Sequence, residues 1–203
     1  RIKERTWRAA GVMVPLFSLR TEESFGVGDF GDLHRFVDWA SATGMRVIQL
    51  LPVFDTTTSQ TWSDSHPYNC ISLHALHPHY IDLSALGELS SNEDKVKFNR
   101  QRRELNALEE TDYEAVDRLK LHYLRLFFQQ RHEYAIYDEK KLHILFDTDK
   151  EFRYNVELSC FTQYHLHRQF KAAADYARSK GIGICGDMPV GVYRDSVTTW
   201  VHP

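Results

Sequence analysis

Three short apolar runs, each bounded by glycine or proline, set the pattern of the chain. They cover residues 11–17, 47–51 and 182–188. Continuous apolar runs of this length are typical of strands buried on both faces, as in a parallel sheet. We therefore expect three parallel strands, with the residues between them forming the connections.

The segment between the first two runs has the pattern of a helix. Asp29 is a suitable N-cap, Asp32 follows three residues later, and apolar residues recur at helical spacing as far as Ala40. Gly44 stands where a glycine commonly ends a helix. Strand, helix and strand in succession over residues 11–51 predict a βαβ unit with a right-handed crossover.

Residues 90–145 have a different character, because they contain neither glycine nor proline and are rich in charged residues and leucine. We expect a helical insertion there. Thr111 and Glu114 have the spacing of a capping box, in which a hydroxyl and a carboxylate satisfy reciprocal N–H groups. A last helix is expected from roughly Phe152 to Ser179, just before the third apolar run.

Composition narrows the class of protein. The 203 residues are 42% hydrophobic and 26% charged, which excludes disorder. The formal net charge is −3 with neither sign collected in one stretch, so no nucleic-acid partner is expected. No apolar run approaches the ~18 residues of a membrane helix. Cys70, Cys160 and Cys185 lie far apart, which favours reduced thiols in a cytoplasm. We expect a globular cytoplasmic protein.

The predicted elements form an α/β array of three parallel strands, an inserted helical lobe and polar loops after the strands. The chain stops at Pro203, a few residues after the third strand. We therefore expect residues 1–203 to be the opening part of a larger domain. A chain ending there would have an unpaired strand edge, which favours self-association.

A polar–aromatic cluster in the loop after the second strand is the strongest candidate site. It combines Trp62, Asp64, His66 and Tyr68 with Asn69. Proteins bind neutral sugars with this combination, since an aromatic face packs on pyranose C–H groups while carboxylates and amides bind hydroxyls. An ordinary loop with packed aromatic side chains is an equally good interpretation of the residue types alone.

Asp187 follows the third predicted strand, at the edge where parallel α/β folds place their sites. A structural carboxylate that accepts hydrogen bonds from loop amides is a serious alternative there, because Gly186 and Pro189 indicate a tight turn.

Other patterns carry little chemistry. His74, His77 and His79 fit neither a helical pair nor a Cys/His finger, so packed or surface histidines are favoured over a metal site. The glycines at 26 and 28 lack the rest of a phosphate-binding loop. We expect no metal, no nucleotide and no cofactor.

Several motifs together resemble the amylomaltase (4-α-glucanotransferase, disproportionating enzyme) family of the α-amylase clan, most closely its type-2 branch. They run in family order along nearly the whole chain. The matching segments are Gly11-Val-Met-Val-Pro-Leu-Phe-Ser-Leu-Arg20, Phe25-Gly-Val-Gly-Asp-Phe30, Val47-Ile-Gln-Leu-Leu-Pro52 with Asp55-Thr-Thr, Asp64-Ser-His-Pro-Tyr-Asn69, Ala75-Leu-His-Pro-His-Tyr80 and Gly186-Asp-Met-Pro-Val190.

The resemblance implies a (β/α)₈ barrel of which this chain holds about the first three strands, with residues 90–145 as a helical insertion. It also implies transfer of α-1,4-glucan segments by a retaining double displacement, in which one carboxylate attacks the anomeric carbon and a second acid protonates the leaving oxygen. The family's catalytic acids lie on later strands, so no residue here is assigned a catalytic role and the chain alone is expected to be inactive.

The resemblance implies substrate contacts with α-1,4-glucans and maltooligosaccharides. Tyr68 matches an aromatic ring that stacks near the donor sugar, and Asp187 matches a carboxylate of the third strand that organises the substrate site. Asp64 and Ser65 are looser matches in the loop, where His66 departs from the family pattern, and Trp62 joins them on residue type. Two alternatives stay open: a non-catalytic α-glucan-binding module, and an α-glucan hydrolase of the same clan.

Overall fold

Three strands form one parallel sheet in the computed structural model, which describes residues 8–130, 150–189, 191–194 and 196–201. The strands are β1 (Gly11–Val14), β2 (Val47–Leu50) and β3 (Gly183–Cys185), in the order β1-β2-β3. The predicted parallel arrangement is confirmed. The strands are shorter than the apolar runs, since the first run continues into a 3₁₀ turn, η1 (Leu16–Ser18).

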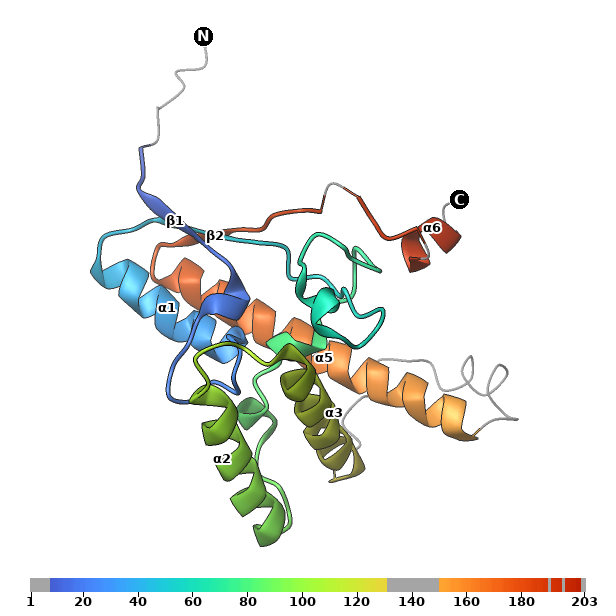
Figure 1. Ribbon diagram of the computed structural model, residues 1–203. Helices are drawn as coiled ribbons and strands as arrows, with labels where there is room; N and C mark the ends of the chain where they lie inside the picture. Colours follow the sequence, from blue (N-terminus) through green and yellow to red (C-terminus); the bar gives the residue numbers. More distant parts are fainter. Residues whose placement is uncertain (1–7, 131–149, 190, 195, 202–203) are drawn as a thin grey trace.

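Helices cover one side of this sheet. Helices α1 (Phe30–Ala42) and α5 (Lys150–Ser179) pack side by side beneath it (Figure 1). Ile48 and Leu50 of β2 are fully buried in the core, whereas Met13 of β1 points to the opposite face and is 62% exposed. The expected burial on both faces is therefore seen on one face only, because both of these helices cover the same side.

Helix α1 begins and ends as its sequence predicts. The Oδ1 atom of Asp29 accepts hydrogen bonds from the backbone N–H groups of Gly31 and Asp32, and the Asp32 carboxylate accepts one from the N–H of Asp29. Gly44 follows the C-cap residue with φ of 77°, a left-handed conformation that glycine adopts without strain.

The described part of the predicted insertion contains two helices, α2 (Asn92–Asn106) and α3 (Tyr113–Gln130). These two helices, which we call the helical lobe, project below the sheet layer (Figure 1) and share one hydrophobic core with it. Residues 131–145 of the predicted insertion lie outside the described ranges. The last predicted helix is present as α5 and ends at Ser179 as expected.

The predicted capping box at the start of α3 is wrong. Asp112, not Thr111, caps the helix, since its Oδ1 accepts a hydrogen bond from the N–H of Ala115 at 2.9 Å. The hydroxyl of Thr111 instead accepts a hydrogen bond from Arg20 at 3.0 Å, and the Glu114 carboxylate turns to a different loop. Tertiary partners have replaced the local pair.

A buried lysine joins the helical lobe to the rest of the chain. Lys120 of α3 is only 1% exposed, and its Nζ donates to the carbonyl oxygens of His79 (2.6 Å) and Ile81 (2.8 Å). The same Nζ lies 3.6 Å from Oδ2 of Asp29, the N-cap of α1. One ammonium group therefore links α3 to α1 and to the loop between them.

The remaining short elements are η2 (Trp62–Ser65), η3 (Pro78–Tyr80), η4 (Ser84–Leu86) and α6 (Val197–Val201). None of the helices within the described ranges has both the length and the apolar character needed to cross a membrane.

Candidate functional site

Tyr68 and Asp187, which are 119 positions apart, meet at the carboxyl-terminal edge of the sheet. The phenol of Tyr68 donates a hydrogen bond to Oδ2 of Asp187 at 2.8 Å. Tyr68 lies in the loop after β2, and Asp187 lies two residues beyond the end of β3. The hydrogen bond to Asp187 raises the pKa of Tyr68 above its ordinary value, so at neutral pH the phenol keeps its proton and remains a donor.

Backbone hydrogen bonds hold together the two loops that carry this pair. The N–H of Tyr193 donates to the carbonyl oxygen of Cys70 at 2.9 Å, and the N–H of Val197 donates to that of Ile71 at 3.0 Å. Burial raises the pKa of the Cys70 thiol, which favours the protonated, unreactive form. The segment after β3 is thus joined to the chain just beyond Tyr68.

Asp64 organises the loop that precedes Tyr68. Its carboxylate is 4% exposed and accepts hydrogen bonds from the backbone N–H groups of Thr58, Ser59 and Gln60 and from two hydroxyls. Burial alone would raise the pKa of Asp64, but the hydrogen bonds outweigh it and hold the pKa below its ordinary value. Gln60, with φ of 56°, completes this tight turn. The carboxylate therefore faces its own loop, which favours an indirect role in binding.

Trp62 and Ser65 lie in η2, on the same loop. The Trp62 side chain is 72% exposed, while Ser65 is half-buried. The backbone N–H of Trp62 donates to Oε1 of Glu114 on α3, at 3.2 Å. An exposed indole on an internally hydrogen-bonded loop is available to a ligand. Glu114 was missed as a partner of this loop, because the sequence pattern suggested only a local capping role for it.

Two buried histidines and an aspartate form a second polar cluster beside this loop. The imidazole rings of His77 and His79 are both 2% exposed and stack with centroids 3.6 Å apart. Asp117 of α3 lies beside them, with Oδ1 3.5 Å from Nδ1 of His79. Atoms of the three side chains that are able to ligate a metal lie within 4.8 Å of one another. Asp117 gave no signal in the sequence as a third member of this group.

His77 does not fit the role of a metal ligand in this cluster. Nδ1 of His77 accepts a hydrogen bond from the N–H of His79 at 3.2 Å, so the neutral ring carries its proton on Nε2 and offers no lone pair there. Burial lowers the pKa of both histidines well below the ordinary value. The two rings are therefore neutral at pH 7, and Nε2 of His77 and both ring nitrogens of His79 have no hydrogen-bond partner among the described residues. His74, in contrast, is exposed.

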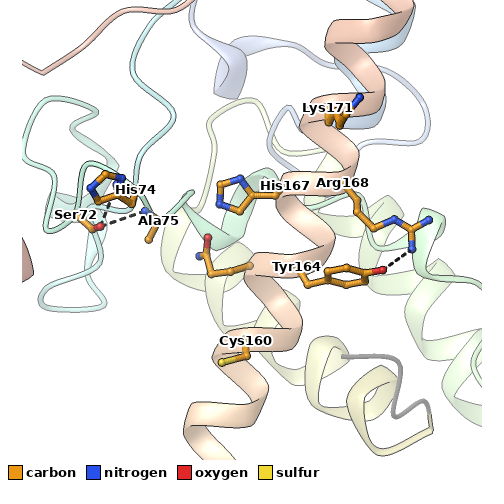
Figure 2. A pocket seen from close by; sticks show the side chains of 9 residues that line it. Ser72, His74, Ala75, Cys160, Tyr164, His167, Arg168 and Lys171 are labelled. Carbon is orange, nitrogen blue, oxygen red and sulfur yellow. Dashed lines mark hydrogen bonds between the residues drawn. The ribbon is translucent and has the colours of Figure 1, made fainter. Parts of the chain in front are cut away.

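A separate groove of about 540 Å³ lies between the loop at 72–75 and the outer face of α5. Figure 2 shows the loop on one side and the helix on the other, with Arg168 donating a hydrogen bond to the Tyr164 hydroxyl at 3.2 Å. Its lining residues differ from the five predicted for substrate: Ser72, His74, Ala75, Cys160, Gln163, Tyr164, His167, Arg168 and Lys171.

Comparison with known proteins decides the family. The sequence profile described as 4-alpha-glucanotransferase matches residues 14–145 and 132–203, which is most of the chain. The chain belongs to the 4-alpha-glucanotransferase family. The resemblance of its motifs is thereby confirmed at the level of the family.

Curated members of the 4-alpha-glucanotransferase family align over the whole chain or nearly so. The rice (Oryza sativa subsp. japonica) 4-alpha-glucanotransferase DPE2 is 34% identical and is aligned to 100% of this chain, which covers 26% of that protein. The 4-alpha-glucanotransferase of Chlamydia trachomatis is 28% identical over 95% of the chain, which covers 43% of it. The chain therefore spans about a quarter to under half of these relatives.

Solved structures confirm the fold. The amylomaltase of Corynebacterium glutamicum superposes with a TM-score of 0.73 at 20% identity, over 95% of this chain and 32% of that one. The amylomaltase of Streptococcus agalactiae, solved in complex with acarbose, superposes with a TM-score of 0.57 at 24% identity, over 97% of this chain and 46% of that one. The predicted partial α/β barrel is confirmed.

Proposed function

We propose that the protein carrying this chain is a 4-α-glucanotransferase that moves α-1,4-glucan segments between maltooligosaccharides or glucans. Family membership and the names of the curated relatives support this activity. The contact between Tyr68 and Asp187 links this activity to particular residues. It lies at the carboxyl-terminal edge of the sheet, where parallel α/β folds bind substrates. We also propose that the protein is cytoplasmic.

The Tyr68–Asp187 pair suits the recognition of a neutral sugar. The Tyr68 ring offers a face for pyranose C–H groups, and its hydroxyl is engaged by Asp187. A carboxylate has two oxygens and about four lone pairs, so Asp187 retains acceptor capacity for sugar hydroxyls after accepting one hydrogen bond. The acarbose complex of the Streptococcus agalactiae amylomaltase supports a carbohydrate ligand.

The η2 residues have different roles in this proposal. The exposed indole of Trp62 contacts the glucan directly, Ser65 lies within reach of the same loop surface, and Asp64 acts by holding the loop in shape.

Catalysis is a retaining double displacement in this proposal, and it needs a nucleophilic carboxylate and a second carboxylic acid. Both are proposed to lie outside this chain, so that Tyr68 and Asp187 bind and orient substrate without taking part in bond cleavage. The chain alone then binds glucan but transfers nothing.

The test is an assay with maltotriose, run in parallel on the full-length protein and on the 203-residue chain. We expect the full-length protein to release glucose together with longer oligosaccharides, and the chain alone to leave maltotriose intact. Products that are only shorter than maltotriose would establish a hydrolase instead. Transfer by the chain alone would place the catalytic acids within these residues and overturn the assignment above.

A glucan-binding module is the second candidate, favoured by the 72% exposure of Trp62. It predicts saturable quenching of tryptophan fluorescence by maltoheptaose, lost in Trp62→Ala, in a full-length protein that turns over no substrate. Turnover by the full-length protein would exclude it.

A further inference from the structure

We propose that Glu114 of α3 is a positioning residue: it holds the Trp62 loop in the orientation that binds glucan and so makes the helical lobe part of the substrate site. The inference rests on the proposed function, because it concerns how Trp62 is presented to sugar. It starts from one contact, in which Oε1 of Glu114 accepts the backbone N–H of Trp62 at 3.2 Å across 52 positions of sequence.

Hydrogen bonds within the loop around Trp62 hold residues 56–64 together. The Asp64 carboxylate accepts hydrogen bonds from the backbone N–H groups of residues 58–60. The hydroxyls of Ser59, Thr61 and Ser63 lie within 2.7–3.1 Å of one another. The buried hydroxyl of Thr56 also donates to the carbonyl oxygen of Asp64. A loop closed internally in this way transmits a restraint at one residue to the whole segment.

Glu114 supplies such a restraint from outside the loop. Trp62 is the first residue of η2, and the first N–H groups of any helical turn have no acceptor within that turn. The carboxylate oxygen of Glu114 supplies the missing acceptor for the N–H of Trp62. It also comes from α3, which packs against η2 and is itself anchored by the buried Lys120.

Other features of the helix do not depend on Glu114. Asp112 caps α3, so replacing Glu114 leaves the cap in place. The Glu114 side chain is exposed, so its replacement opens no cavity. The expected effect is therefore on the position of Trp62, an indole that must present its face to a sugar ring, rather than on folding.

Four variants of the full-length protein distinguish the effect of the length of the Glu114 side chain from the effect of its charge. Glu114→Ala removes the acceptor, and Glu114→Asp keeps the charge on a side chain one methylene shorter. Glu114→Gln keeps an oxygen acceptor at the same reach but loses the charge. Glu110→Ala removes a neighbouring exposed acid and is the matched control.

The measurements are KM and kcat for maltoheptaose and a thermal melt of each variant. We expect Glu114→Ala and Glu114→Asp to raise KM by about 3- to 10-fold with kcat within twofold of wild type, because binding is weakened while the reacting groups are untouched. Glu114→Gln and Glu110→Ala should stay within twofold in KM. Melting temperatures should agree within a few degrees.

A double-mutant cycle with Trp62→Ala completes the test. Once the indole is absent, Glu114→Ala should add no further increase in KM. An unchanged KM in Glu114→Ala, or effects of the two substitutions that multiply independently, would overturn the inference while leaving the proposed function intact. A loss in Glu114→Gln with none in Glu114→Asp would assign the effect to charge and also overturn it. A wild-type protein that transfers nothing would overturn the proposed function, and the inference with it.

Discussion

Replacing Lys120 with methionine removes the charge that joins the helical lobe to the sheet layer while keeping a side chain of similar length. Lys120 is 1% exposed. Its Nζ donates to the carbonyl oxygens of His79 and Ile81 and lies 3.6 Å from Oδ2 of Asp29. The variant leaves two buried carbonyl groups without this donor and a buried carboxylate without its cation.

The magnitude follows from what is left unpaired. A buried acceptor that loses its donor costs about 1–3 kcal/mol, and breaking a buried ion pair costs about 3–5 kcal/mol. These two effects overlap, since one ammonium group supplies both. We therefore expect the free energy of unfolding to fall by about 3–5 kcal/mol at a pH where Asp29 is ionised.

The loss should depend on pH through Asp29. Burial raises the pKa of Asp29 from 3.8 to about 7, against the opposing effect of Lys120. The native state thus holds a proton that the unfolded state has released, and the stability present below pH 3.8 is lost as pH rises through about 7. Without Lys120 the pKa of Asp29 rises further, and each unit adds about 1.4 kcal/mol above that pKa.

Urea unfolding of wild type and Lys120→Met at pH 5.5 and pH 8 measures both effects. At pH 5.5 Asp29 is protonated in both proteins, so only the carbonyl hydrogen bonds are lost and we expect a decrease of about 1–3 kcal/mol. At pH 8 the decrease should be larger by up to about 1.4 kcal/mol, because pH 8 lies one unit above the wild-type pKa of Asp29 of about 7. In an Asp29→Asn background the two pH values should give the same decrease. Equal losses at both pH values with Asp29 present would refute the reasoning.

Three further outcomes test other parts of the structure. Tyr68→Phe removes the hydrogen bond to Asp187 but keeps the ring, so we expect kcat/KM for maltotriose to fall roughly tenfold, less than for Tyr68→Ala; equal losses would show that the hydroxyl is irrelevant. Gly28→Ala places a Cβ 2.1 Å from a backbone carbonyl oxygen of η1, so it should destabilise folding by more than about 2 kcal/mol in urea unfolding, whereas Gly186→Ala, with open space around its Cβ, should not. Asp64→Ala removes the acceptor of three loop N–H groups. We expect protease cleavage within residues 56–64 to accelerate at least tenfold. An unchanged cleavage rate would show that the loop keeps its conformation without this carboxylate.

Local patterns were sufficient to predict most of the elements. The Asp29–Asp32 capping pair and Gly44 mark the ends of α1 because each acts on backbone groups within one turn. The three apolar runs located the strands of the parallel sheet. Tyr68 and Asp187 were singled out from motif and position alone, as was the exposed Trp62 loop.

Contacts between distant segments could not be predicted in this way. The spacing of Thr111 and Glu114 is that of a capping box, yet Arg20 and the N–H of Trp62 are the partners that these side chains bind in the folded chain. The hydrogen bonds that the Asp64 carboxylate accepts from the N–H groups of residues 58–60 could not be predicted either.

Periodicity, caps and turn residues act through neighbours within a few positions, so the amino-acid sequence by itself predicted the three strands and the helices α1 and α5. Which polar groups meet is a different matter. The Tyr68–Asp187 pair, the position of Asp117 beside His79 and the burial of Lys120 depend on which segments come together when the apolar faces are buried. Each polar group then takes the partner that best replaces water, and that partner is often more than 40 residues away along the chain.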